Sequence, residues 1–160
     1  MKASVYVETS VISYLGARLS GDLTVASHQQ LTQEWWDRRS DWSLYVSALV
    51  HREASAGDID AAERRIALLT GIPVLELTDA VFNLTSLLLT GAALPRNAEE
   101  DAAHIAIAAV NGLDFLLTWN CKHIANATKR SIIEAICRST GYQPPIICTP
   151  EELLGDGNVE

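Results

Sequence analysis

Short, nearly continuous apolar runs alternate with longer runs of helical spacing along most of this sequence, and this alternation limits the possible folds more than any other feature. The strand-like runs are ASVYV, WSLYV, PVLEL, LDFLLTW and the start of PPIICTPEELL, which begin at residues 3, 42, 73, 113 and 144. Helical patterns fill the intervals, for example at 22–39, 79–90 and 97–112. Strands that are apolar on both sides and separated by helices are typical of parallel sheets. The sequence therefore predicts an α/β fold, with a central parallel sheet flanked by helices on both faces.

Several of the expected helices begin with a residue suited to N-capping. Thr9 or Ser10 can cap the helix that contains VISYLGA. Ser47 can cap the following ALVHREASAG helix, which would carry Glu53 between one and two turns from its start. Near the C-terminus, Thr149 and Glu152 have the spacing of a capping box.

The chain has 160 residues, of which 48% are hydrophobic, and this is enough to fill one core. We expect a single domain over residues 1–154 and a C-terminal tail over 155–160. No apolar run approaches the roughly 18 residues of a membrane helix, and Glu8 interrupts what would have to be a signal-peptide core. The three cysteines lack C-x-x-C spacing, which favours reduced thiols. We therefore expect a cytoplasmic protein without a membrane partner.

The formal charge of −8 and the pI of about 4.9 mean that the chain as a whole repels a polyanion. Any bound nucleic acid must be held by a local basic patch or through cations. Arg52, Lys122, His123 and Lys129 are candidates for such contacts, although Lys129 and Arg130 are more simply explained as solvated charges.

Polar side chains are expected to converge at one edge of the sheet. Glu8 ends the first strand, Asn120 follows the strand DFLLT by two residues, and Glu53 and Asp101 lie in the N-terminal parts of helices. Ligands of parallel α/β sheets bind beyond the carboxyl ends of the strands. Three carboxylates held close together repel one another unless a cation or protons neutralise them. Oxygen ligands of this kind suit Mg²⁺ or Mn²⁺.

Ordinary explanations exist for each of these residues taken alone. Asp101, like Glu99 and Glu100, can simply favour the positive end of a helix dipole. Asp101 and His104 share one helical face, and with His123 they could form a zinc site if both histidines point inward. The adjacent Trp35 and Trp36 cannot both face the core, so one of them is a candidate partner surface.

Three segments together resemble the PIN-domain ribonucleases, in particular the VapC-like toxins of prokaryotic toxin-antitoxin pairs. They are VYVETSVISYL, YVSALVHREASAGD and EEDAAHIAIAAVNGLDFLLTWNCKHIAN, and in this order they cover nearly the whole chain. The resemblance implies a PIN-like three-layer sandwich whose first strand lies near the middle of the sheet. It also implies an acidic site of Glu8, Glu53, Asp101 and Asn120, with the hydroxyl of Thr9 or Ser10 in support. Aspartate is usual in the family at the positions of Glu8 and Asn120, so this chain keeps the oxygen ligands but has one charge fewer.

The function implied by this resemblance is metal-dependent endoribonuclease activity, with Mg²⁺ or Mn²⁺ as cofactor. Glu8, Glu53 and Asp101 would hold the cation, and Asn120 would orient water or substrate. The expected substrate contacts are Thr9, Ser10, His104, Lys122 and His123. The expected partners are RNA, an antitoxin protein and a second copy of the chain in a homodimer.

Two other functions fit parts of the sequence. A catalytically weakened PIN domain that works as a binding or assembly module is favoured by Asn120. A phosphotransfer receiver also places acids at strand ends, but it needs a phosphorylatable aspartate after the third strand, and PVLELTD offers only Asp79 at a helix start.

Overall fold

The computed structural model describes residues 1–155 and contains a five-stranded parallel sheet in the order β3-β2-β1-β4-β5. The strands are β1 (Ser4–Val7), β2 (Ser43–Ser47), β3 (Val74–Leu75), β4 (Phe115–Leu117) and β5 (Ile146–Cys148). The first strand is therefore central, as the family resemblance implied. The tail predicted at 155–160 lies, beyond Gly155, outside the described residues.

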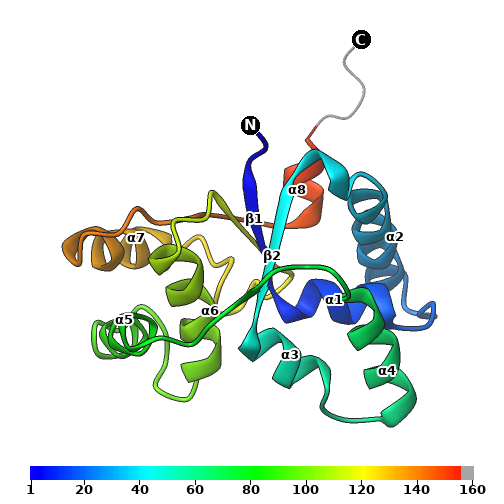
Figure 1. The fold of residues 1–160 in the computed structure, drawn as a ribbon, viewed down its shortest axis with the longest axis horizontal. Coiled ribbons are helices and arrows are strands. Elements are labelled where there is room, and N and C mark those ends of the chain that lie inside the picture. The colour runs from blue at the N-terminus through cyan, green and yellow to red at the C-terminus, as the bar shows by residue number, and fades with distance from the viewer. Residues whose placement is uncertain (156–160) are drawn as a thin grey trace.

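Helices cover both faces of this sheet, which confirms the predicted three-layer sandwich (Figure 1). They are α1 (Thr9–Gly16), α2 (Leu23–Asp37), α3 (Ala48–Ala54), α4 (Ile59–Leu68), α5 (Asp79–Thr90), α6 (Glu99–Val110), α7 (Arg130–Ser139) and α8 (Pro150–Leu154), with a 3-10 turn η1 (Arg39–Asp41). Helices α5, α6 and α7 lie on one side of β1 and β2, and the remaining helices lie on the other (Figure 1). No helix within residues 1–155 is long and apolar enough to cross a membrane.

Two of the three N-caps predicted from the sequence are confirmed. Ser47 caps α3 by accepting from the Val50 N–H, and Thr149 forms the capping box of α8 with Glu152. The cap of α1, however, is Glu8 and not Thr9 or Ser10, because the Glu8 carboxylate itself accepts from the N–H of Ser10. The carboxylate at the end of β1 is therefore fixed by the helix that follows it.

Several elements are shorter than their apolar runs suggested. The strand β4 begins only at Phe115, and the preceding Asp114 uses its carboxylate to accept from the backbone N–H and hydroxyl of Ser4 at the amino end of β1. Helix α7 begins at Arg130 and not near Asn126, since the Asn126 side chain accepts from the N–H of Thr128 and holds a turn that competes with the helix. These differences leave the sheet and its edges unchanged.

The register aligns the carboxyl ends of the central strands. Val7 pairs with Leu117, and the N–H of Glu8 donates to the carbonyl of Leu117 at 3.0 Å. The core of the domain is formed by fully buried residues of the sheet and of its covering helices, such as Tyr6, Leu116 and Ile105. Of the two adjacent tryptophans, Trp35 is fully buried and Trp36 is half-buried, as their spacing required. The chain segments that leave β1, β2 and β4 consequently meet at one edge of a rigid sheet.

Candidate active site

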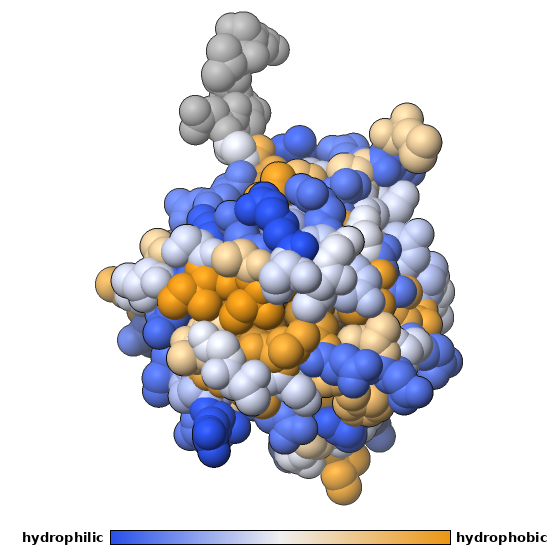
Figure 2. All heavy atoms as spheres, turned by 90° about the vertical axis from the view of Figure 1, so that its left-hand side faces the viewer, coloured by the Kyte–Doolittle hydropathy of each residue, from blue (hydrophilic) through white to orange (hydrophobic). Residues whose placement is uncertain are grey.

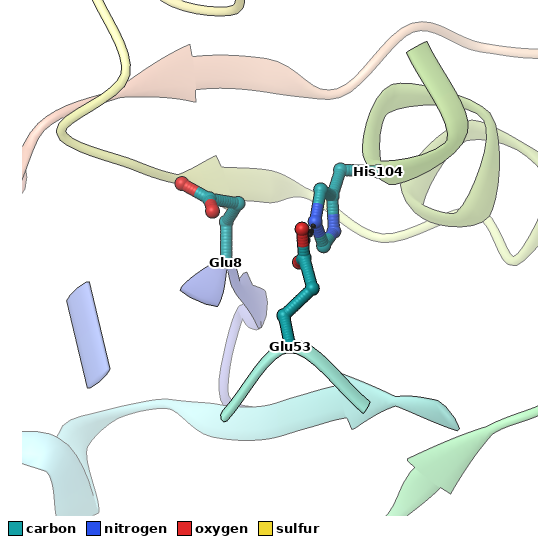
Figure 3. A group of neighbouring side chains, drawn as sticks. All are labelled: Glu8, Glu53 and His104. Carbon is teal, nitrogen blue, oxygen red and sulfur yellow. Dashed lines mark hydrogen bonds and ion pairs between the residues drawn. The ribbon is translucent and has the colours of Figure 1, made fainter. Parts of the chain in front are cut away.

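Glu8 is held at this edge by hydrogen bonds from two chain segments. Its Oε2 accepts from the N–H of Ser10 at 2.9 Å, and its Oε1 accepts from the hydroxyls of Ser10 and Thr118, each at 2.5 Å. The residue is only 5% exposed. A carboxylate that is removed from water in this way needs such donors to offset its lost hydration. In Figure 3 the carboxylate is turned toward the end of β4, from which Thr118 comes.

Glu53 lies next to Glu8, and one of its two oxygens makes two short side-chain contacts. Its Oε1 accepts from the Thr9 hydroxyl and contacts Nε2 of His104, both at 2.6 Å. Figure 3 shows the Glu53 carboxylate reaching from α3 to the imidazole that projects from α6. Two elements from different parts of the chain thus orient one carboxylate.

The contact between Glu53 and His104 changes the pKa values of both groups. Burial opposes the charged form of Glu53, but the hydrogen bonds from His104 and Thr9 and the charge of His104 outweigh it and lower the pKa from 4.5 to about 2. Burial likewise disfavours the charged form of His104, yet the hydrogen bond to Glu53 and the surrounding carboxylates raise its pKa above 6.5. The pair therefore favours an ionised carboxylate beside a protonated Nε2.

Behind His104, two further polar side chains lie in the core. The hydroxyl of Tyr6 lies 2.7 Å from Nδ1 of His104 and 2.8 Å from the Ser47 hydroxyl, and all three residues are fully buried. Burial, ahead of the nearby carboxylates, raises the pKa of Tyr6 well above 10, so its hydroxyl keeps its proton. From the sequence, Tyr6 was expected only as part of the first strand and Ser47 only as a helix cap, so their contact with the site was not predicted. The alternation of side chains along a strand was the available indication, because Tyr6 and Glu8 face the same side.

Asp101 and His123 form a second pair close to the first one. The Asp101 carboxylate contacts Nδ1 of His123 at 2.8 Å, and the two side chains are 25% and 22% exposed. The charge of Asp101 also contributes to the raised pKa of His104, one turn further along α6. His104 and His123 therefore each face a different carboxylate, whereas a shared zinc site would require them to converge.

Asn120 organises the loop that follows β4. Its Oδ1 accepts from the N–H of His123 at 3.1 Å, and its own N–H donates to the Thr118 hydroxyl at 2.9 Å. Lys122 lies in the same loop and is exposed. The loop thus joins the Asp101 pair to Glu8, through His123, Asn120 and Thr118 in turn.

Glu100 is an additional acidic residue at the site that the sequence analysis treated only as a helix-start charge. A hydrogen bond to Glu53, followed by partial burial and the charge of Glu53, raises the pKa of Glu100 above 4.5. Arg52 lies 3.5 Å from the Glu100 carboxylate on the exposed side. Nothing in the sequence distinguishes Glu100 from Glu99, since acidic residues are common in the first turn of a helix.

The side chains fit a divalent cation through their oxygens. Within residues 1–155, ligand atoms of Glu8, Glu53 and His104 lie within 4.8 Å of one another. The two carboxylates supply the hard oxygen donors that Mg²⁺ and Mn²⁺ prefer. The imidazole suits the set less well as long as its Nε2 carries a proton toward Glu53. Asp101 lies outside this tight group, and contributes its charge from the start of α6.

Comparisons with known proteins find similar structures but no similar sequences. No protein-family model and no curated protein sequence matches the chain. Among solved structures, VapC20 of Mycobacterium tuberculosis, described as a toxin that cleaves the sarcin-ricin loop, has a TM-score of 0.59 and 18% identity over 77% of this chain and 95% of its own. VapBC2 from Rickettsia felis, in a structure bound to a promoter DNA fragment, has a TM-score of 0.51 and 11% identity over 91% of this chain and 98% of the matched chain.

The chain therefore has the PIN-domain fold of the VapC toxins, which confirms the predicted fold. At sequence identities of 18% and 11%, these matches establish a shared fold and do not establish a shared activity. Any activity has to be argued from the site itself.

Proposed function

We propose that this protein is a metal-dependent endoribonuclease and the toxin of a toxin-antitoxin pair. The observation that carries the proposal is the position of Glu8 and Glu53. One buried and one half-buried carboxylate, each fixed by hydroxyl donors, lie together at the carboxyl edge of a sheet with the VapC fold. Holding like charges close together is costly for a purely structural purpose and is expected of a cation site.

In this proposal Glu8 and Glu53 hold Mg²⁺ or Mn²⁺ directly, and Asp101, outside their tight group, is a water-bridged ligand. A bound cation would polarise a phosphate oxygen and make hydroxide available from water near neutral pH. The residues of the chain orient that reaction. Thr9 and Ser10 keep the two buried carboxylates in place, and their hydroxyls lie at the start of α1, where a phosphate oxygen would approach.

The loop after β4 supplies the remaining contacts. His123 faces Asp101 through Nδ1, so its Nε2 is on the opposite side of the ring and is assigned to the leaving-group oxygen. The exposed Lys122 is assigned to the RNA backbone. The Oδ1 of Asn120 is engaged by the loop, which leaves its amide nitrogen to orient water or phosphate.

The hydrogen bond that Oδ1 of Asn120 accepts within the loop also favours a second function. A chain that has one carboxylate fewer at the site, and whose Asn120 oxygen holds a loop, suits a catalytically weakened PIN domain that acts as a binding or assembly module. The two proposals differ in whether purified protein cuts RNA.

Cleavage of a mixed RNA pool tests the proposal directly. Purified protein is incubated with Mg²⁺, with Mn²⁺ and with a chelator, and Asp101→Asn is assayed beside Asp79→Asn. Both substitutions remove an acid from the first turn of a helix, but only the first touches the site. Metal-dependent cutting that is lost in Asp101→Asn and retained in Asp79→Asn supports the nuclease. A folded protein that cuts with neither metal supports the binding module.

The expected partners are an antitoxin and a second copy of this chain, in the cytoplasm. Apolar side chains gather in the middle of the face that α5 and α7 form (Figure 2), and Phe82 and Leu87 of α5 are 55% and 44% exposed. We assign this face to the homodimer. Light scattering should give a dimer for the natural chain and a monomer for Phe82→Ser, whereas Leu23→Ser on α2 should remain dimeric. A monomeric natural chain would exclude the assignment.

A further inference from the structure

His104 is buried more completely than a substrate contact or an accessible ligand would be. Its side chain is 1% exposed, and both ring nitrogens are engaged, Nε2 by Oε1 of Glu53 at 2.6 Å and Nδ1 by the Tyr6 hydroxyl at 2.7 Å. Glu53 lies between the imidazole and the solvent side, with 23% of its side chain exposed. Whatever His104 contributes to the site must therefore pass through Glu53.

The hydrogen-bond chain behind His104 determines where the protons are. The Ser47 hydroxyl oxygen accepts from the N–H of Val50 at 3.2 Å, and the Tyr6 hydroxyl, 2.8 Å away, is the acceptor that its contacts offer to its own proton. The proton of Tyr6 is then directed to Nδ1 of His104, and the imidazole proton lies on Nε2. Any other arrangement leaves a buried hydroxyl proton without an acceptor, which costs free energy.

The same conclusion holds when the imidazole is charged. A doubly protonated ring donates from Nδ1 to Tyr6 and from Nε2 to Glu53. This state leaves one hydroxyl proton of Tyr6 or Ser47 without an acceptor, and the charge pairing with Glu53 offsets that cost. An unprotonated Nε2 would instead bring its lone pair within 2.6 Å of a carboxylate oxygen, where the two repel. In both favourable states Nε2 is a donor and has no lone pair to offer a cation.

This donor fixes the orientation of Glu53. Oε1 of Glu53 receives two hydrogen bonds, one from Thr9 and one from His104, which come from different elements. Rotation of the carboxylate would break both bonds, so the Glu53 carboxylate is held in one orientation at the site. Histidine-carboxylate pairs of this kind commonly orient the ligands of metal centres.

We propose that His104 is a positioning residue, which is locked by Tyr6 and Ser47 and orients the carboxylate of Glu53 toward a divalent cation held jointly with Glu8. The proposal rests on the proposed function for the cation, but the proton on Nε2 is a property of the chain alone. A protonated Nε2 cannot coordinate a cation, so His104 is excluded from the ligands, although the imidazole lies close enough to both carboxylates to share a cation with them.

Nitrogen NMR of the full chain tests the proton directly, with Mg²⁺ as a diamagnetic probe. The Nε2–H signal of His104 should be present in metal-free protein and should persist after Mg²⁺ is added. Loss of that proton at saturating Mg²⁺, or an unprotonated Nε2 in metal-free protein, would overturn the proposal.

Two variants test the positioning itself. The amide of His104→Gln retains a donor for Glu53, whereas His104→Leu has none. Binding of Mn²⁺ to the free protein, measured by electron paramagnetic resonance, should weaken roughly 10–100-fold in His104→Leu and be largely rescued in His104→Gln. Equal affinity of the natural chain and a folded His104→Leu would contradict the proposal.

The two proposals can fail separately. If the natural chain binds no Mn²⁺, both the metal-dependent nuclease and the positioning of Glu53 for a cation are refuted. Only the proton on Nε2 in the free protein then remains. If Mn²⁺ binds and RNA is not cut, the positioning role stands without the nuclease.

Discussion

The hydroxyl of Thr118 should be a principal support of the acidic site, and Thr118→Val isolates it. Thr118 is fully buried and its Oγ1 donates to Oε1 of Glu8 at 2.5 Å while accepting from the N–H of Asn120 at 2.9 Å. Valine has nearly the same shape and removes only the hydroxyl. The substitution therefore leaves the packing intact and deletes two hydrogen bonds, one of which involves a carboxylate.

The size of the effect follows from these two contacts. A hydrogen bond to a charged group contributes about 1.5–3 kcal/mol to stability, and a half-buried N–H left without an acceptor costs about 1 kcal/mol more. The unfolding free energy should fall by about 2.5–4 kcal/mol, which corresponds to roughly 5–16 °C in melting temperature for a domain of this size.

Thr85→Val is the matched control in a thermal and urea denaturation series at neutral pH. Thr85 is also buried, but its hydroxyl donates only to the carbonyl of Val81 within α5. Its loss should cost no more than about 1 kcal/mol. If Thr118→Val were no less stable than Thr85→Val, the contact with Glu8 would not support the site and our account of its rigidity would be wrong.

Three further outcomes can be measured independently. Asn120→Asp should tighten Mn²⁺ binding in calorimetry by restoring a negative charge, and an unchanged affinity would place Asn120 away from the cation. The raised pKa of His104 stabilises the fold fully below pH 6.5 and less as the pH rises through the folded-state value, whereas the lowered pKa of Glu53 stabilises it above pH 4.5 and less as the pH falls toward about 2. The stability difference between the natural chain and His104→Leu should therefore be largest between pH 4.5 and 6.5, and a difference independent of pH would contradict this coupling. A thiol reagent should label only Cys121 in the folded protein, because burial raises the pKa of the other two cysteines to about 11 and 12, and labelling of all three without unfolding would refute it.

The order of elements was predictable because it depends on local patterns. Apolar strands, helical periodicity and caps such as Ser47 act within a few residues, and they indicated the α/β class before any contact was known. The site was predictable only in part. The ends of β1 and β4 placed Glu8 and Asn120 at one edge, since all strands of a parallel sheet point the same way.

The partners of those residues depend on side-chain geometry that the sequence does not encode locally. Glutamate is an uncommon N-cap, so the role of Glu8 at the start of α1 was missed. Tyr6 resembles any large core residue, and only its distance to His104 reveals a polar role. The pairing of Asp101 with His123 depends on how the loop after β4 folds back over α6.

The central position of β1 has a consequence for synthesis on the ribosome. The first strand is made early, but its neighbour β4 and the Thr118 hydroxyl that holds Glu8 come more than a hundred residues later. His104, which contacts Glu53, is made only shortly before β4, because it lies in α6. A nascent chain that still lacks residues 115–123 therefore carries Glu8 without its partner strand and without the loop that completes the site. The contacts of Glu8 and Asp101 are therefore complete only after residues 115–123 have been made.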